Sequence, residues 1–421
     1  MEKFIIEKNS KLKGTVKISG SKNSVLPILA ATLLSTGKCV IHGVPFLKDV
    51  IVMKQILENL GAEIEYDEKK CTIKSQISNI TNFEPSYDLV TQMRASFLVM
   101  GAILARKGKV KIPLPGGCPI GSRPIDLHLK GFSALGAEIL SEHGFVLATC
   151  GNLIGTNIYL DFPSVGATEN IMMACVFAEG QTTLQNCAVE PEIVDLANFL
   201  NAMGADIRGA GTDTIKINGV TELNGCEHTV IPDRIEAGTF MVAAAITNGD
   251  IVLENVVVDH LKPIIAKLKE ANVKVEEVEN GLRVCKSEDS KLKGVDIKTM
   301  PYPGFPTDMQ AQFMSLLGVA EGTSIFTETI FENRFMHATE LVRMGADIKI
   351  DSRTAIIEGV KTYLGAKVKA TDLRAGAAML LSALQADGKS EISEIHHIDR
   401  GYYLIEKKLK DLGANIERVK T

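Results

Sequence analysis

An internal repeat is the feature that most constrains the fold of this chain. An apolar run that closes on glycine and leads into a strand-like run occurs six times, first as ILAATLLSTGKCVI and last as MLLSALQADGKSEI. Glycine suits a helix end because it adopts the left-handed conformation at little cost. The closing glycines are Gly37, Gly108, Gly180, Gly249, Gly322 and Gly388, which lie 66 to 73 residues apart. The spacing predicts six copies of one structural unit.

A second motif, Leu-x-x-Leu-Gly-Ala-x-Ile or a close variant, alternates with the first. It predicts a second helix end in each copy, where asparagine is the usual substitute for glycine. These ends are Gly61, Gly136, Gly204, Asn272, Gly345 and Gly413. The helices before them, such as 52–60 and 404–412, carry charges along one face and are expected to be half exposed. The helices of the first motif are small and apolar nearly all round, so we expect them to be enclosed.

Enclosed helices require sheets around them. The predicted fold class is therefore α/β, with buried helices inside, strands outside, and six copies divided into two bodies of three. The alternative is a single open solenoid of six copies. A length of 421 residues is compatible with two or three domains.

The composition excludes several classes of protein. With 45% hydrophobic and 23% charged residues the chain is an ordinary globular protein, and a net charge of −5 argues against a general nucleic-acid surface. The N-terminus lacks the apolar core of a signal peptide, and no apolar stretch is long enough to span a bilayer. We therefore expect a cytoplasmic protein without membrane contact. Its eight cysteines include no C-x-x-C pair, so neither a zinc site nor a redox dithiol is signalled, and most should be reduced thiols.

Four cations lie just ahead of enclosed helices, namely Lys22, Arg94, Arg234 and Arg374. Parallel helices would gather their N-termini at one end of each body, where free N–H groups favour anions. Cations are disfavoured there, so a bound anion opposite them would explain their presence. Structural ion pairing is the alternative for each one. Together they predict a ligand with phosphate or carboxylate groups that lies between the two bodies.

The segment PLPGGCPIGSRPID, residues 113–126, is too rich in proline and glycine for regular structure. Cys118 at its centre lies five residues from Arg123, which favours an exposed thiol of lowered pKa, although an incidental loop thiol is the alternative. No Lys-Ser/Thr follows the glycines, so a P-loop is excluded, and no hydrolase elbow, zinc-protease or dinucleotide motif occurs. The adjacent His396 and His397 are predicted to lie on a strand, one buried and one exposed.

Several of these segments together resemble the enolpyruvyl transferases, of the type that acts on UDP-N-acetylglucosamine. The segments are PGGCPIGSRPIDLH, SGSKNSVLPILAA, SVGATENIM, PDRIEAGTF, FPTDMQAQF, ENRFMH and HHIDRGY. The resemblance runs from residue 1 to 421, and the cysteine loop separates this type from the shikimate-pathway type. It implies a two-domain inside-out α/β barrel of six βαβαββ repeats. Residues 22–231 would form the domain with the cysteine loop, residues 1–21 and 232–421 the other, and the active site would lie in the cleft between them.

The resemblance also implies an activity. The enolpyruvyl group of phosphoenolpyruvate would pass to the 3-hydroxyl of UDP-N-acetylglucosamine through a tetrahedral ketal, with release of phosphate, in the first committed step of peptidoglycan synthesis. These two substrates are the expected partners. No metal or organic cofactor is implied, and protein partners stay open. The rival activities are enolpyruvyl transfer to shikimate 3-phosphate and non-catalytic sensing of a nucleotide sugar.

Site residues follow from the same resemblance. Cys118 matches the proton donor, which fosfomycin alkylates in this family, and Asp308 matches the base at the sugar hydroxyl. The phosphoenolpyruvate site would consist of Lys22, Asn23, Arg123 and Arg400, of which Lys22 and Arg400 would also be catalytic. The nucleotide-sugar contacts would be Asn23, Arg94, Arg123, Pro124, Ile125, Asp126, Leu127, Ser164, Val165, Gly166, Asp308 and Ile330, with Arg334 and Arg374 as further polar residues. Some members carry a lysine where this chain has Phe162, followed by Pro163, which puts a diphosphate contact there in doubt.

Overall fold

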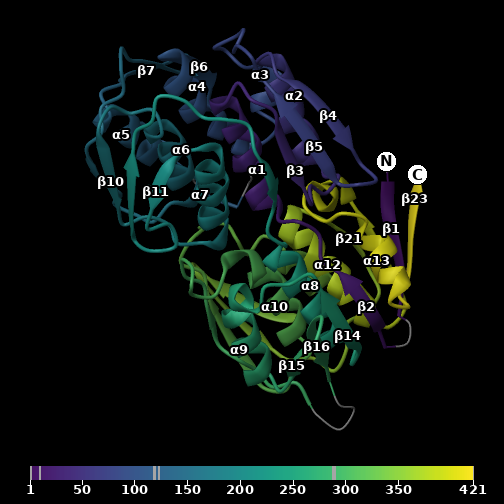
Figure 1. The fold of residues 1–421 in the computed structure, drawn as a ribbon. Helices are drawn as coiled ribbons and strands as arrows, with labels where there is room; N and C mark the ends of the chain where they lie inside the picture. The colour runs from purple at the N-terminus through teal and green to yellow at the C-terminus, as the bar shows by residue number, and fades with distance from the viewer. Residues whose placement is uncertain (1, 9–10, 117–119, 122–123, 287–290, 421) are drawn as a thin grey trace. The chain divides into compact units, whose positions relative to one another are not determined.

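The computed structural model describes residues 2–8, 11–116, 120–121, 124–286 and 291–420. It divides into two compact units (Figure 1). Unit 1 comprises the described residues up to 19, Ile120 and Gly121, and the described residues from 232 onward. Unit 2 comprises the described residues from 20 to 116 and from 124 to 231. In the described part of the chain five of the six repeats have the element order βαβαββ, and in the second repeat of unit 2 the short helix α3 (Tyr87–Val90) takes the place of the first strand.

The three repeats of unit 1 each place one long helix between two parallel strands. The first consists of β2 (Lys13–Lys17), α8 (Arg234–Ile246), β14 (Asp250–Glu254), α9 (Lys262–Glu270), β15 (Lys274–Val278) and β16 (Gly281–Cys285). The second consists of β17 (Ile297–Lys298), α10 (Gln310–Leu317), β18 (Thr323–Thr327), α11 (Ala338–Arg343), β19 (Asp347–Asp351) and β20 (Thr354–Glu358). The third consists of β21 (Lys367–Lys369), α12 (Leu373–Gln385), β22 (Lys389–Ser393), α13 (Ile405–Asp411), β23 (Asn415–Lys420) and β1 (Glu2–Glu7).

Unit 2 follows the same order, except that its second repeat begins with a short helix. Its first repeat consists of β13 (Glu227–Thr229), α1 (Lys22–Ala31), β3 (Cys39–His42), α2 (Lys48–Asn59), β4 (Glu63–Asp67) and β5 (Thr72–Gln76). Its second consists of α3 (Tyr87–Val90), α4 (Val99–Lys107), β6 (Lys109–Pro113), α5 (Asp126–Ala134), β7 (Glu138–Glu142) and β8 (Phe145–Thr149). Its third consists of β9 (Asn157–Tyr159), α6 (Val165–Cys175), β10 (Gln181–Gln185), α7 (Pro191–Met203), β11 (Asp206–Arg208) and β12 (Thr214–Asn218).

Short 3-10 helices precede or extend several of these elements. They are η1 (Thr32–Leu34), η2 (Arg94–Leu98), η3 (Val258–Leu261), η4 (Thr307–Met309) and η5 (Ile395–Arg400). Three of them, η2, η4 and η5, carry residues that the sequence placed in the site.

Each repeat builds its own sheet. Five sheets have four strands in the spatial order first, second, fourth, third, as in β17-β18-β20-β19, and the sheet β6-β8-β7 has three. The first two strands of the four-stranded sheets are parallel and the remaining pairs antiparallel, for example Thr183 opposite Asn157 in β10 and β9. These are separate sheets, so in the part of the chain described here the strands do not close into one continuous barrel.

Strands from distant parts of the chain complete two sheets in unit 1, where β2 also pairs with β14, and one sheet in unit 2. In unit 1, β1 near the N-terminus lies between β22 and the C-terminal β23, antiparallel to both, which brings the two chain ends together (Figure 1). In unit 2, β13 pairs in parallel with β3, from the other end of that unit. Each unit is therefore closed on itself, and the alternative of one open solenoid is wrong.

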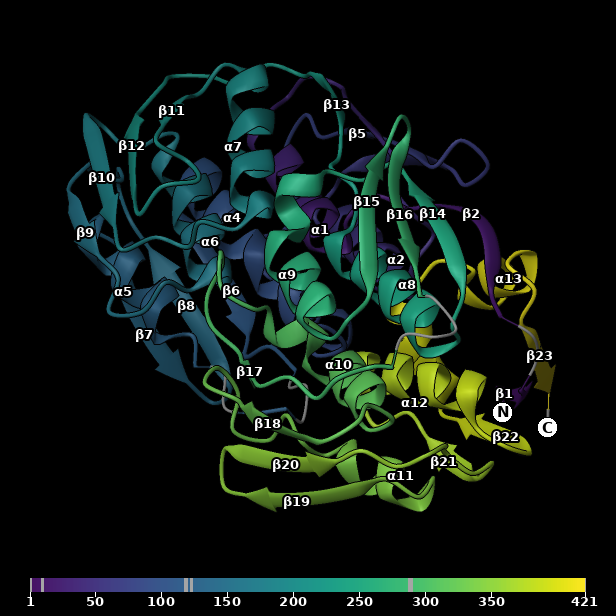
Figure 2. The same cartoon turned by 90° about the horizontal axis from the view of Figure 1, so that it is seen from below.

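The enclosed helices form the core of each unit. α8, α10 and α12 pack against one another in unit 1, as Figure 2 shows, and α1, α4 and α6 do so in unit 2. Every residue of α8 from Ile235 to Ile246 is buried. By contrast α2 buries one face, with Val50, Met53 and Leu57 inside, and exposes the other. Both classes of helix predicted from the sequence are confirmed.

The two series of helix-ending residues differ in whether their backbone is left-handed. All six positions of the Leu-Gly-Ala series are left-handed, including Asn272 with φ 68°. In the other series only Gly108 directly caps its helix in this conformation. Gly180, Gly322 and Gly388 are left-handed but lie in the turn before the next strand, whereas Gly37 and Gly249 have no positive φ. At the fourth copy the preceding Asn248, with φ 51°, makes the turn instead.

The prediction that His396 and His397 lie on a strand is wrong. His396 and His397 lie in the 3-10 helix η5, not on a strand, and their rings contact each other with centroids 4.1 Å apart. His396 is exposed and His397 half-buried. A tight helical turn keeps successive side chains near each other, unlike a strand.

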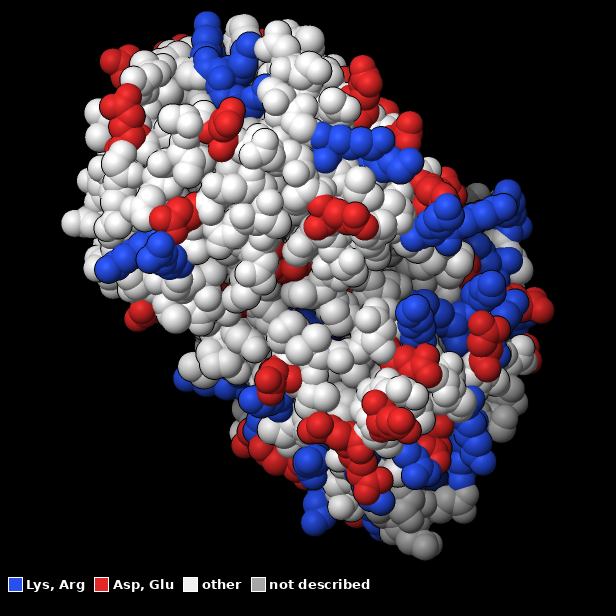
Figure 3. Space-filling model, viewed as in Figure 1, with Lys and Arg blue, Asp and Glu red and all other residues white. Residues whose placement is uncertain are grey.

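Charges of both signs are interspersed on the face shown in Figure 3, without a broad field of one sign. This pattern agrees with the net charge of −5. Among the helices that the structure describes, none combines the length and the apolar character needed to cross a bilayer.

The close packing of the enclosed helices predicts a destabilising substitution. A Cβ added at Gly101 in α4 would lie 2.2 Å from the backbone oxygen of Asn170 in α6. We expect Gly101→Ala to lower the free energy of unfolding by at least about 2 kcal/mol, because two backbones must separate. Urea unfolding followed by circular dichroism measures this change. The matched control is Gly151→Ala, where an added Cβ meets nothing within 4 Å; equal stability of the two variants would contradict the prediction.

Candidate functional site

Asp308 is the centre of a charged cluster in unit 1. It lies in η4, immediately ahead of α10. Arg334 Nη2 donates to Asp308 Oδ1 and Arg374 Nη2 donates to Asp308 Oδ2, both at 2.8 Å. The two arginines are only 4% exposed, whereas 28% of the Asp308 side chain is exposed. The carboxylate is therefore held in place from both sides and still reaches solvent.

Tyr402 connects this cluster to all three enclosed helices of unit 1. Its hydroxyl lies 2.9 Å from Thr239 Oγ1 of α8, and it accepts from Gln312 Nε2 of α10 at 3.3 Å and from Arg374 Nη1 of α12 at 3.2 Å. The three partners come from the N-terminal half of each helix. The N-termini of these helices thus gather at one end of the unit, as the sequence predicted.

The buried positive charge of Arg374 is compensated by acidic groups of the protein itself. Burial by itself would lower the pKa of Arg374, but the charge of Asp308, followed by Tyr402 and Asp233, raises it above its usual value. Asp372 caps α12 by accepting from the N–H groups of Arg374 and Ala375. Breaking a buried ion pair of this kind costs about 3–5 kcal/mol, because the remaining charge stays buried.

Glu328 is a positioning residue that the sequence analysis missed. It is 1% exposed, and its Oε1 accepts from the backbone N–H of Ile330 at 2.8 Å. Its Oε2 accepts from the hydroxyl of Thr307, the neighbour of Asp308, at 3.0 Å. One buried carboxylate therefore holds the loop of Ile330 beside the turn of Asp308. A single Glu after strand β18 carries no recognisable motif, so only the fold shows this role.

Arg400 closes η5 and is half-buried, two residues before Tyr402. The pKa of His397 is lowered, mainly by burial. The charges of His396 and then of Arg400 lower it further. His337 is buried, and its pKa falls to about 4, chiefly through burial, while Arg334 also lowers it. A neutral imidazole therefore lies beside Arg334.

In unit 2, Lys22 is the first residue of α1 after the N-cap Ser21. Its ammonium group lies 3.3 Å from Asp49 Oδ2, and Asp49 belongs to the first turn of α2. Both side chains are largely buried, at 13% and 5% exposure. Asn23 follows Lys22 in the same helical turn and is half-buried.

A second cluster of unit 2 gathers around His128, a residue that the sequence analysis did not select. Its Nδ1 lies 3.1 Å from Asn170 Nδ2, and its ring contacts Phe97 edge to face. Gly166 packs against it, since a Cβ there would lie 3.4 Å from His128 Cε1. Arg94 is near enough for its charge to lower the pKa of His128.

This cluster brings together three segments predicted to bind the nucleotide sugar. Arg94 begins η2 and donates from Nη2 to the carbonyl oxygen of Pro124 at 3.2 Å. Asp126 and Leu127, which follow Pro124 and Ile125, begin α5. Ser164 caps α6, ahead of Val165 and Gly166, and accepts from the N–H of Ala167 at 3.3 Å.

Two predicted residues, Cys118 and Arg123, lie outside the described residues. The carbonyl of Ile120, which lies between them in the sequence, accepts from the N–H of Asn333, the neighbour of Arg334, at 2.9 Å. Phe162 is 45% exposed.

Cations ahead of the enclosed helices have partners within the protein, so the expectation that each needs a bound anion is only partly correct. Lys22 pairs with Asp49, and Arg374 pairs with Asp308. Arg234 lies over the ring of Tyr302, 5.6 Å from its centroid. Structural ion pairing, the alternative, therefore applies to Lys22 and Arg374, whereas the partner shown for Arg234 is an aromatic ring.

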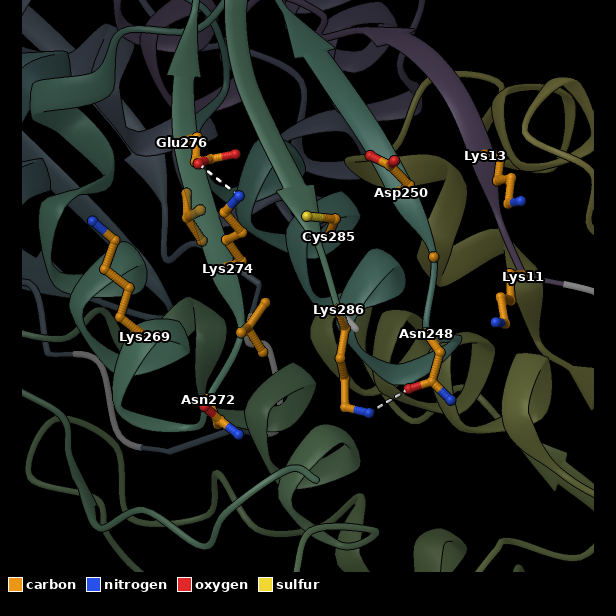
Figure 4. A pocket seen from close by; sticks show the side chains of 13 residues that line it. Lys11, Lys13, Asn248, Asp250, Lys269, Asn272, Lys274, Glu276, Cys285 and Lys286 are labelled. Carbon is orange, nitrogen blue, oxygen red and sulfur yellow. Dashed lines mark hydrogen bonds and ion pairs between the residues drawn. The ribbon is translucent and has the colours of Figure 1, made fainter. Parts of the chain in front are cut away.

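A hollow of about 730 Å³ in unit 1 lies on the sheet β15-β16-β14-β2 (Figure 4). Its lining includes Lys11, Lys13, Lys269, Lys274 and Lys286, and none of the residues that the sequence placed in the site. Lys269 lies in the last turn of α9, and Lys286 donates to Asn248 just after α8 (Figure 4). Cations are favoured at the C-terminal ends of helices, which accounts for part of this positive charge.

In the described part of the chain, no group of three or more His, Cys, Asp or Glu side chains could hold a metal ion.

The environment of His128 predicts a pH dependence of stability. Burial, with a smaller contribution from Arg94, lowers its pKa to about 3, against 6.5 for an ordinary histidine. Below pH 6.5 the unfolded chain binds a proton that the folded protein does not bind. The free energy of unfolding therefore falls between about pH 6.5 and pH 3, by up to about 1.4 kcal/mol per pH unit from this residue.

Urea unfolding at several pH values between about 6.5 and 4.5 checks this prediction. We expect a smaller slope of stability against pH for His128→Gln, which retains a polar partner for Asn170. The exposed His143 provides the control substitution His143→Gln, which should keep the slope of the unmodified chain. An unchanged slope in His128→Gln would contradict the assignment.

Comparison with known proteins places the chain in a family. The family model described as EPSP synthase (3-phosphoshikimate 1-carboxyvinyltransferase) matches residues 6–409. UDP-N-acetylglucosamine 1-carboxyvinyltransferase 1 of Caldanaerobacter subterraneus subsp. tengcongensis is 62% identical over 416 residues, which cover 99% of this chain and 99% of that protein. UDP-N-acetylglucosamine 1-carboxyvinyltransferase 2 of Carboxydothermus hydrogenoformans is 59% identical over 100% of both chains.

Solved structures agree with this result. The enolpyruvyl transferase NikO from Streptomyces tendae has a TM-score of 0.90 and 26% identity, with 100% of this chain and 99% of that chain covered. An EPSP synthase from Acinetobacter baumannii, at 21% identity and full coverage of both chains, has a TM-score of 0.75 and shares the fold. The chain belongs to the family of UDP-N-acetylglucosamine 1-carboxyvinyltransferases, within the wider group of enolpyruvyl transferases that the EPSP synthase model matches.

Proposed function

We propose that this chain is an enzyme that transfers the enolpyruvyl group of phosphoenolpyruvate to the 3-hydroxyl of UDP-N-acetylglucosamine and releases phosphate. The observation that carries the proposal is the 62% identity to a UDP-N-acetylglucosamine 1-carboxyvinyltransferase over almost the whole of both chains. The product would enter peptidoglycan synthesis. The cytoplasmic location is part of the same proposal.

The reaction needs two proton transfers. One proton must reach the methylene carbon of phosphoenolpyruvate and another must leave the sugar hydroxyl, so that a tetrahedral ketal forms before phosphate is eliminated. We assign the first transfer to Cys118 and the second to Asp308. In support of the second assignment, Arg334 and Arg374 fix both carboxylate oxygens of Asp308, which leaves the group oriented and partly open to solvent. Orientation matters here because an ordinary carboxylate is a weak base at neutral pH.

The anionic groups of the substrates need cations. We assign the phosphate and carboxylate of phosphoenolpyruvate to Lys22, Arg123 and Arg400, with Asn23 beside them. Guanidinium groups suit this task because they bind paired oxygens with two parallel hydrogen bonds. Asp49 holds Lys22 at 3.3 Å, so the ammonium group is placed before the ligand arrives.

The nucleotide sugar is assigned mainly to unit 2. Arg94, residues 123–127 and residues 164–166 come from three different elements, and the described members meet around the neutral His128. The N-terminus of α6 points its first N–H groups and the positive end of its dipole toward a ligand, which favours a phosphate. From unit 1 we add Asp308 and Ile330. We propose that both units serve the same reaction.

The direct test is release of inorganic phosphate from phosphoenolpyruvate. We expect release with UDP-N-acetylglucosamine and none without an acceptor. The family model also names 3-phosphoshikimate, so shikimate 3-phosphate is the second acceptor to test. Release with that acceptor alone would replace the proposed substrate, and no release with either would indicate a protein that binds a nucleotide sugar without catalysis.

Asp308→Asn tests the proposed base. It removes the proton acceptor, and we expect kcat to fall by about 100-fold or more. The exposed Asp347→Asn in the same unit is the matched control and should leave kcat unchanged. Because Asp308 also pairs two buried arginines, the melting temperature and the affinity for UDP-N-acetylglucosamine are measured in parallel. A folded, ligand-binding Asp308→Asn with nearly normal kcat would rule out the role.

Cys118→Ser tests the proposed proton donor. A hydroxyl is a much weaker acid than a thiol, so we expect retained nucleotide-sugar affinity and loss of most turnover. Steady-state kinetics and isothermal calorimetry separate the two effects, and undiminished turnover at neutral pH would count against the donor role.

Fosfomycin, which mimics phosphoenolpyruvate, should label Cys118 and no other cysteine. Mass spectrometry of the intact and digested protein identifies the labelled residue. A label on any of the other seven cysteines would contradict the assignment.

A further inference from the structure

Two cysteines that are far apart in the sequence face each other in one sheet of unit 2. Glu227 of β13 pairs with Val40 of β3, and the N–H of Val40 donates to the carbonyl of Cys226 at 2.8 Å. Cys226, just before β13, therefore lies opposite Cys39, the first residue of β3. Neighbouring strands are about 4.8 Å apart, which falls inside the range of about 4.4–6.8 Å between the Cα atoms of a disulfide.

The two thiols also interact. The pKa of Cys39 is lowered, chiefly because the Cys226 thiol hydrogen-bonds to it, although burial opposes this effect. Cys39 is buried, whereas Cys226 is half-buried and so lies nearer to solvent. The Cys39 thiolate therefore forms more readily than the thiolate of a lone buried cysteine, whereas the same contact raises the pKa of Cys226. By comparison, burial raises the pKa of Cys175 and of Cys187 to about 12.

We propose that Cys39 and Cys226 form a reversible disulfide when the protein meets hydrogen peroxide. The thiolate of one cysteine attacks a peroxide oxygen, the O–O bond breaks, and a sulfenic acid and hydroxide form. The second thiol then attacks the sulfenic sulfur, loses its proton and expels the oxygen as water. In total, two thiols and one peroxide give one disulfide and two waters. Two electrons pass from sulfur to oxygen, and a dithiol reductant reverses the step.

The position of the pair gives the disulfide a structural effect. The chain begins unit 2 just before α1 and β3 and completes it with β13, so the bond would join the first and last parts of the unit. It would close a loop from residue 39 to residue 226. A cross-link across so long a loop restricts the unfolded chain strongly and should therefore stabilise the unit. This inference does not depend on the proposed enzymatic function.

The experiment uses the full chain with Cys118→Ser, which removes the loop thiol from competition. The protein is treated with hydrogen peroxide, the remaining thiols are blocked with N-ethylmaleimide, and the digest is analysed by mass spectrometry without reduction. We expect a cross-linked peptide pair that contains Cys39 and Cys226 and has lost two hydrogens. Dithiothreitol should remove it. The oxidised protein should melt several degrees higher than the reduced protein.

Three variants sharpen the test. Cys39→Ser and Cys226→Ser should each abolish both the cross-link and the rise in melting temperature. Cys71→Ser, which changes a half-buried cysteine outside the pair, should retain both. The proposal is overturned if Cys39 and Cys226 are recovered fully alkylated after other thiols have been oxidised. It is also overturned if the cross-link forms only in denaturant, or if the rise in melting temperature persists in Cys39→Ser.

Discussion

Burial of three helices side by side is the constraint on which each unit depends. Their small apolar side chains leave no face for solvent, so strands must cover them on the outside, and the three repeats of each unit provide those strands. A single repeat could not enclose its own helix. The need for closure also explains why β1 joins β22 and β23, and why β13 returns to β3.

The same arrangement creates a polar end in an otherwise apolar core. Helix N-termini have N–H groups without partners inside the helix, and these groups must be satisfied. In unit 1 the caps Asp233 and Asp372 do so, and the charged cluster of Asp308, Arg334 and Arg374 lies at the same end. Chemistry can be placed there because the helices behind it are rigid and the side chains are fixed by several partners. A carboxylate gripped by two buried guanidinium groups can change position only if that packing changes.

Two buried residues that no motif would reveal hold together segments of the predicted site. His128 has the pKa of a buried neutral imidazole, and segments that begin three different elements meet around it. Glu328 holds two loops through bonds to Ile330 and Thr307. Their types are ordinary, and their importance comes from what surrounds them. Likewise, the carboxylate that pairs with Lys22 comes from another helix, 27 residues along the chain, so a cation that looked unbalanced in the sequence is balanced in the fold.

The sequence by itself determined the six repeats, the two classes of helix and the left-handed helix ends at positions such as Gly61 and Asn272, because periodicity and local backbone energetics involve neighbouring residues only. It also indicated the family, through segments such as SVGATENIM. The full-length relatives confirm that family. Only the tertiary structure decided which strand completes each sheet, which carboxylate pairs with Lys22 or Arg374, and that His396 and His397 lie in a 3-10 helix. These features depend on contacts between residues far apart in the chain, and the energy of such contacts is set by burial and geometry that a linear pattern does not contain.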